Sequence, residues 1–99
     1  MSVQENRPVL ILDCHRGIYF GYLVEELDGG KTVILENARH CFYFVKPAKE
    51  HEGVYGLATI GPQKGSRVGP RVDMKVMDVT KIVTCTSVAV VAWEAARWG

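Results

Sequence analysis

The chain has 99 residues, of which 47% are hydrophobic and 23% charged, and this size and composition exclude a disordered chain and a second hydrophobic core. Twelve Lys and Arg residues against eleven Asp and Glu residues leave a formal charge of +1, which excludes a global attraction to nucleic acid or membranes. No apolar stretch approaches the ~20 residues of a membrane-spanning helix, and residues 1–7 lack the pattern of a secretory signal, so we expect a cytoplasmic protein.

The first half of the chain predicts four β-strands in a meander. Its apolar runs are short, rich in β-branched and aromatic residues, and separated by turn-forming residues. A glycine inside a strand often marks a bulge, so Gly21 predicts a bend in the second strand. The residues 28–30, Asp-Gly-Gly, predict a tight hairpin turn, because glycine supplies the positive φ that such turns need. The four predicted strands are Val9–Leu12, Ile18–Val24, Lys31–Leu35 and His40–Val45.

The second half of the chain predicts a short helix, a basic loop, a strand and a final helix. The spacing of apolar residues over Lys49–Ile60 favours a short amphipathic helix, which the Gly-Pro pair at 61–62 ends. A basic, glycine-rich loop follows at 63–72. Alternating apolar residues over Val76–Thr84 then predict one long or bent strand.

The predicted C-terminal helix is apolar on most of its sides. It runs from Val88 to about Trp98, with Thr86 or Ser87 as its cap, and carries only two charged residues. A domain of this size covers one face of such a helix and leaves the other face for a second copy of the chain, so we expect a homo-oligomer. In the alternative, the tryptophans pack inward and the small side chains are simply exposed. The predicted interface residues are Val90, Trp93 and Trp98.

The basic loop is the candidate anion site. Flexible backbone amides with basic and hydroxyl side chains can surround a phosphate, although the loop matches neither a P-loop nor a dinucleotide fingerprint. Between two of the predicted strands, Arg39 offers a planar fork that suits carboxylates or phosphates. The alternatives are a solvated connector for the loop and a simple turn with exposed side chains around Arg39. The candidate ligand-binding residues are Lys64, Ser66, Arg67, Arg71, Arg39 and Asn37.

The cysteines and histidines predict neither a metal site nor a catalytic centre. Three cysteines without a CxxC spacing argue against a disulfide framework or a zinc ribbon. The neighbours Cys14-His15 and His40-Cys41 contain the ligand types of a zinc site, but neighbours on a strand point to opposite faces, which disfavours a shared metal. Cys85 lacks the local signature of a catalytic cysteine. We therefore expect no metal, no cofactor and no enzymatic activity.

Four short motifs cover most of the chain: GIYFG at Gly17–Gly21, ENARHCFYF at Glu36–Phe44, LATIGPQKGSRV at Leu57–Val68 and DVTKIVTCT at Asp78–Thr86. In this order, and with a tryptophan-bearing tail, the chain resembles a family of small proteins of unknown function encoded by bacteriophages and prophages. The resemblance implies a phage accessory protein and brings no catalytic residues with it. Phage proteins of this size often occupy a host protein or sequester a nucleotide used in host defence, so the resemblance implies a counter-defence role.

These patterns predict a single β-rich domain over residues 1–99, with 1–8 as a polar lead. The predicted fold class is α+β and mainly β: a small antiparallel sheet or partly open barrel of about five strands, with one short central helix and a C-terminal helix. The expected function is non-enzymatic binding by a homo-oligomer that acts on a host factor or captures a small anionic, nucleotide-like ligand. The alternative is a nucleic-acid-binding module with a small Sm-like or OB-like barrel, which the near-zero net charge disfavours.

Overall fold

The computed structural model describes residues 7–15, 17–43, 54–63 and 66–96. It confirms a mainly β fold in which one antiparallel sheet is accompanied by a short central helix and a C-terminal helix. The sheet has six strands, and a 3₁₀ turn at Asp28–Gly30 joins the second strand to the third. The elements are β1 (Arg7–Asp13), β2 (Ile18–Leu27), β3 (Thr32–Tyr43), α1 (Val54–Thr59), β4 (Arg67–Val68), β5 (Val72–Val76), β6 (Val79–Thr84) and α2 (Ser87–Ala95).

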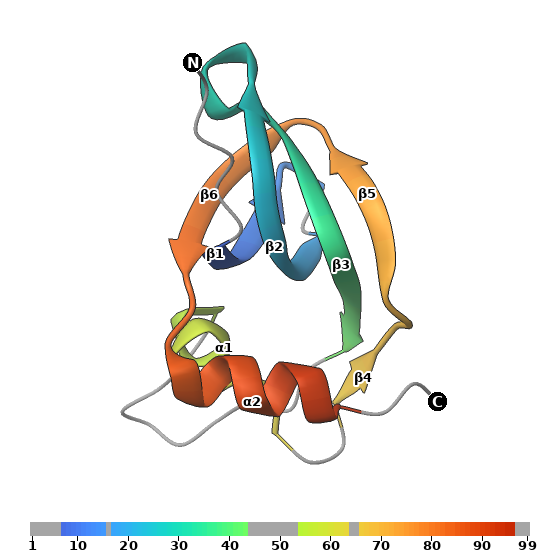
Figure 1. Cartoon of the computed structure of the whole chain (residues 1–99), viewed down its shortest axis with the longest axis vertical. Helices are drawn as coiled ribbons and strands as arrows, with labels where there is room; N and C mark the ends of the chain where they lie inside the picture. The colour runs from blue at the N-terminus through green and yellow to red at the C-terminus, as the bar shows by residue number, and fades with distance from the viewer. Residues whose placement is uncertain (1–6, 16, 44–53, 64–65, 97–99) are drawn as a thin grey trace.

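The sheet curls so that its two edges turn toward each other. Its strand order is β4-β3-β2-β1-β6, and β5 also pairs with β3. Strands β5 and β6 therefore lie at opposite edges, although only Met77 and Asp78 separate them in the chain. Figure 1 shows them on opposite sides of the β2–β3 hairpin and joined over one end, while α2 crosses the other end. The sheet stays open, because β6 pairs with neither β4 nor β5 among the described residues.

β3 is a single bent strand, so the prediction of two strands with a break between them is wrong. Asn37 lies at the bend with a φ of 48°, and the register of β3 with β2 and with β5 shifts around it. Asparagine tolerates this left-handed backbone better than most residues. Opposite this bend, the register shift between Phe20 and Tyr22 marks a bulge at Gly21, where the sequence predicts a bend, and a Cβ there would lie 3.0 Å from the Cβ of Ala38. The bend thus depends on a close approach of two strands.

The predicted strand Val76–Thr84 is divided between β5 and β6. Asp78 has a φ of 58°, and the turn that it forms with Met77 carries the chain from one edge of the sheet to the other. The backbone N–H of Val79 donates to the carbonyl of Lys31 at 2.8 Å, which fastens this turn to the start of β3. The predicted loop at 63–72 also differs, because it contains β4 and the first residue of β5.

Both helices have the boundary residues that the sequence predicts. Thr86 caps α2, and its hydroxyl accepts a hydrogen bond from the N–H of Ala89 at 3.1 Å. Gly61 follows α1 with a φ of 81°, and a Cβ there would lie 2.5 Å from the Cβ of Ala92 on α2. The first residues predicted for the central helix and the last ones predicted for the C-terminal helix lie outside the described residues. No helix in the described part of the chain is long and apolar enough to cross a membrane.

The hydrophobic core has two parts, one on each face of the sheet. Val9 and Ile11 belong to the part enclosed by the curled strands. Leu10, Phe20 and Trp93 belong to the part between the sheet and the two helices. Because successive residues of a strand point to opposite faces, β1 is buried on both sides. The unbroken apolar run of β1 in the sequence reflects this burial on both faces.

Candidate functional site

Two of the predicted anion-binding arginines meet at the C-terminal end of α2. Arg39 on β3 donates from Nε to the carbonyl of Gly69 and from Nη1 to the carbonyl of Trp93, both at 2.7 Å. Arg71 donates from Nη2 to the main-chain carbonyl of Glu94 at 2.8 Å and to its carboxylate at 3.3 Å. Cations are stabilising at a helix C-terminus, where the last carbonyls carry partial negative charge. The two arginines therefore anchor α2 to the sheet.

Burial gives Arg39 a structural role. The residue is 3% exposed, and burial, followed by the charge of Arg71, lowers the pKa of its guanidinium, while the Glu94 carboxylate acts in the opposite direction. Burial, followed by the Glu94 carboxylate that accepts its hydrogen bond, raises the pKa of the Tyr22 hydroxyl. A ligand cannot reach Arg39 without displacing α2. The predictions of a ligand contact or an exposed turn at Arg39 are therefore corrected to an internal contact with the helix.

The other predicted ligand-binding residues lie in two further places. The backbone N–H of Asn37 donates to the Asp73 carboxylate at 3.1 Å, in an exposed contact between β3 and β5. Ser66 and Arg67 lie together at β4, which pairs with the end of β3. Lys64 lies outside the described residues. Of the predicted set that the structure describes, only Ser66 and Arg67 remain as neighbours on an accessible surface.

A row of three rings on β2 and β3 was not predicted from the sequence. The rings of Tyr19 and His40 stack with their centroids 4.7 Å apart and their planes 23° from parallel. The rings of His40 and Phe42 follow at 4.4 Å and 48°. Tyr19 and His40 are register partners, and Phe42 is two residues further along β3, so all three rings share one face of the sheet. Phe42, at the outer end of the row, is 55% exposed.

Asp13 holds the inner end of the row. Its carboxylate accepts hydrogen bonds from the N–H groups of His15 at 2.9 Å and Gly17 at 2.7 Å, and from the Tyr19 hydroxyl at 3.2 Å. Burial alone would raise the pKa of Asp13, but these donors outweigh burial and lower the pKa. Burial, followed by the charge of Asp13, raises the pKa of Tyr19. At neutral pH the hydroxyl thus donates to an ionised carboxylate, which fixes the Tyr19 ring.

Arg67 lies beside the exposed end of the row. Arg67 on β4 pairs with Tyr43, and the register shift between Cys41 and Tyr43 leaves Phe42 as the extra residue beside this pair. Val68 is buried in the core under the helices, so Arg67 points away from that core. A Cβ on Gly69 would lie 3.1 Å from the Phe42 ring, so a glycine lets this segment pass close to the ring. Arg67 is exposed, and it forms no ion pair with any residue that the structure describes. We name the set Tyr19, His40, Phe42 and Arg67 the aromatic–arginine face.

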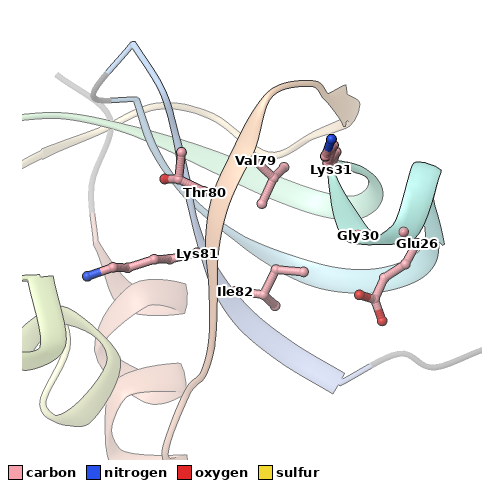
Figure 2. Close-up of a pocket in the computed structure, with 8 residues that line it drawn as sticks. Glu26, Gly30, Lys31, Val79, Thr80, Lys81 and Ile82 are labelled. Carbon is pink, nitrogen blue, oxygen red and sulfur yellow. The ribbon is translucent and has the colours of Figure 1, made fainter.

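A groove between β6 and the tip of the β2–β3 hairpin has a volume of about 340 Å³. Figure 2 shows Val79 and Ile82 extending from β6 toward the hairpin tip, whereas Lys81 extends to the other side. None of the predicted site residues lines this groove, and its few charged residues are of both signs, so it offers no concentrated anion site. The lining residues are Glu26, Gly29, Gly30, Lys31, Val79, Thr80, Lys81 and Ile82.

The exposed surface of α2 differs from the predicted interface. Trp93 is fully buried in the core, so it is not available as a surface contact, and its predicted place in an interface is corrected. Val90 is half-buried against the same core, and Trp98 lies outside the described residues. The outer side of the helix instead carries Val88 and Val91, which are 61% and 69% exposed. The helix therefore has an apolar surface, but other side chains form it.

The three cysteines are free thiols in different surroundings. Cys14 is exposed, whereas Cys41 and Cys85 are buried. Burial raises the pKa of Cys41 to about 11 and that of Cys85 to about 12, so both thiols stay protonated at neutral pH and pack as apolar residues. The two Cys–His pairs of the sequence do not converge: within the described ranges, neither His40 nor Cys41 belongs to a cluster of three metal-ligating side chains.

No curated protein and no solved structure matches the chain. The model of one protein family, described as a domain of unknown function (DUF6948), matches residues 6–93. The matched region contains all six strands, α1 and α2 as far as Trp93, and it includes every residue of the aromatic–arginine face. The chain therefore belongs to this family of unknown function.

Proposed function

We propose that this protein is a non-enzymatic, homo-oligomeric binding protein that captures a small anionic, nucleotide-like ligand on the aromatic–arginine face. The observation that carries the proposal is the exposed ring of Phe42 beside the exposed guanidinium of Arg67. A nucleotide joins a planar base to a phosphate. This face offers one contact suited to each of the two groups.

Stacking supplies a large part of the binding energy in this proposal. A base stacked on an aromatic side chain contributes ~1–3 kcal/mol. The row is already ordered, because Asp13 holds Tyr19 and the Tyr19 ring stacks on His40, so binding loses little side-chain entropy. Arg67 adds a charge-assisted, bidentate contact to a phosphate.

Single-stranded nucleic acid is the second candidate ligand, and the exposed ring of Phe42 on the sheet favours it. Small β-barrels that bind single strands stack bases on such rings. The formal charge of +1 favours the small ligand, since tight binding of an extended strand draws on many basic contacts.

A phage origin, which the order of the sequence motifs implies, agrees with capture in place of catalysis. A protein that removes a signalling nucleotide of the host, or occupies a host protein, acts stoichiometrically and needs no catalytic centre. The proposed setting is the cytoplasm of an infected cell, with counter-defence as the role.

Replacing Phe42 with alanine should weaken nucleotide binding about 5- to 150-fold, because the loss of one stacking contact costs ~1–3 kcal/mol. The probes are ribonucleoside 5′-monophosphates and a short single-stranded RNA, each titrated by isothermal calorimetry. The variant Arg67→Ala should weaken binding of the same probe and reduce its dependence on salt, because one phosphate contact is lost.

Met77→Ala is the control for Phe42→Ala. Met77 is 61% exposed, lies in the turn between β5 and β6, and is not part of the aromatic–arginine face. Its replacement should leave the affinity unchanged. Equal losses for both variants, or a wild-type protein that binds none of the probes, would contradict the proposal. A clear preference for the RNA over every monophosphate would favour the second candidate.

The double variant Val88→Glu, Val91→Glu should convert the protein to monomers. The two side chains lie one helical turn apart on the outer side of α2, and charges there oppose burial between two copies. Size-exclusion chromatography with light scattering measures the mass. Both positions are exposed, so the free energy of unfolding should change by less than about 0.5 kcal/mol per substitution. A wild-type protein that is monomeric at every concentration would exclude the homo-oligomer.

A further inference from the structure

Two adjacent turns bring together three side chains of metal-ligating types. Cys14 and His15 lie in the turn between β1 and β2, and Asp78 lies in the turn between β5 and β6. One ligand atom from each residue, a thiol sulfur, a ring nitrogen and a carboxylate oxygen, lies within 4.8 Å of the other two. His15 Nε2 lies 3.9 Å from Asp78 Oδ2.

The first turn explains how two neighbours in sequence reach a common point. On a strand they would point to opposite faces, but Cys14 and His15 follow the last residue of β1 and lie outside the strand. The Asp13 carboxylate accepts hydrogen bonds from the N–H groups of His15 and Gly17, which fixes the path of this turn. Cys14 and His15 can therefore face a common metal ion, unlike neighbours on a strand.

The second turn is held against the first by the backbone. The N–H of Cys14 donates to the carbonyl of Asp78 at 3.0 Å, and Asp13 is the register partner of Val79. These contacts belong to the pairing of β1 with β6, so the fold itself places the carboxylate of Asp78 beside Cys14 and His15. Residues far apart in the sequence thus supply donors to one point.

We propose that Cys14, His15 and Asp78 bind a divalent transition-metal ion such as Zn²⁺. Thiolate, imidazole and carboxylate are the donors of protein zinc sites, and in a tetrahedral site with their usual bond lengths the donor atoms lie about 3.3–3.7 Å apart. Side-chain rotations that move atoms by about 1 Å bring the three donors to that spacing. Ca²⁺ and Mg²⁺ fit poorly because they prefer oxygen ligands alone.

The site has three protein ligands and an open fourth position. The side chains of His15 and Asp78 are largely exposed, so an ion held there stays accessible to water and to a donor from another molecule. The three ligands include no residue of the aromatic–arginine face. The Asp13 carboxylate contacts both the turn of this site and Tyr19, but the ligands themselves are separate. Variants of the three ligands therefore test metal binding without removing a contact of the proposed nucleotide capture.

Titration of the purified protein with Co²⁺ tests the site. A four-coordinate site with one thiolate gives sulfur-to-cobalt charge-transfer absorption in the near ultraviolet and strong d–d bands in the visible range, and Zn²⁺ should displace both. Asp78→Asn is the most informative variant, because asparagine tolerates the left-handed φ of 58° while the anionic ligand is lost. It should weaken Co²⁺ and Zn²⁺ binding by at least ~10-fold, as should Cys14→Ser and His15→Gln.

Asp73→Asn is the matched control, since Asp73 is an exposed carboxylate on β5 outside the cluster, and its affinity for Co²⁺ should equal that of the wild type. Circular dichroism checks that each variant is folded. A cobalt spectrum that persists in Cys14→Ser would assign the metal to another thiol and overturn the proposal. Loss in Cys14→Ser with full affinity in Asp78→Asn would also overturn it, because the ion would then bind without the third ligand.

Discussion

Replacing Trp93 with alanine should lower the free energy of unfolding by about 3–5 kcal/mol, as is usual for a buried tryptophan. The side chain is fully buried, and its ring stacks on Phe20 with the centroids 5.3 Å apart and the planes 4° from parallel. The indole N–H donates to the carbonyl of Leu57 at 2.8 Å. One residue thus joins α2 to both β2 and α1. Because domains are typically stable by about 5–15 kcal/mol, the variant should be marginally folded in urea titrations followed by circular dichroism.

Two further variants separate ring packing from hydrogen bonding. Trp93→Phe keeps a ring against Phe20 but leaves the carbonyl of Leu57 without its donor, so it should cost ~1–3 kcal/mol. Val91→Ala, on the exposed side of the same helix, should change the stability by less than about 0.5 kcal/mol. If Trp93→Ala were no more destabilising than Val91→Ala, α2 would not cover the sheet as described.

The sequence predicts the features that depend only on neighbouring residues, such as the cap and the end of a helix. Thr86 caps α2 because a hydroxyl side chain reaches the free N–H groups of the first helical turn. Gly61 ends the segment of α1 because it accepts a positive φ. The apolar run of β1 is likewise readable, since a strand buried on both faces has no polar residue in its middle.

Strand pairing decides the features that the sequence does not predict. The polar residues around Asn37 resemble a break, yet β3 continues through them because β2 and β5 supply partners on both of its sides. Around Asp78, by contrast, a run that looks continuous in the sequence is broken in the structure. One alternating run becomes two strands, because the turn there carries the chain across to pair with β1. Both outcomes depend on partners far away in the sequence.

For the candidate site, too, the sequence shows which residue types are present but not which of them lie together. As single residues in a sequence, Arg39, Arg67 and Arg71 are equivalent, and only the position of α2 separates Arg39 and Arg71, which bind the end of the helix, from Arg67. The stack of Tyr19 on His40 needs the register of β2 with β3, and a shift by one residue would place the rings on opposite faces. Residue types suited to binding were predictable, but their assembly into a face was not.

Raising the pH from 7.5 to 10.5 should lower the free energy of unfolding by about 2 kcal/mol for each of the two buried thiols, or about 4 kcal/mol in total. Burial raises the pKa of Cys41 to about 11 and of Cys85 to about 12, from an ordinary value of 9.0. Unfolded chains therefore release these protons above pH 9, whereas folded chains retain them. The stabilisation by neutral thiols is complete below pH 9 and is lost between pH 9 and 12.

Urea titrations at both pH values measure this loss, and the cysteines provide the controls. Cys85→Ala removes one buried thiol, so the loss of stability between pH 7.5 and 10.5 should fall to about half that of the wild type. Cys14→Ser removes a thiol that is exposed in the folded chain as it is in the unfolded one, and the full loss should remain. Burial raises the pKa of Tyr19 and Tyr22 as well, so their ionisation adds to the loss in the same direction at higher pH. An identical loss in the wild type and in Cys85→Ala would show that Cys85 is not enclosed between the sheet and the helices.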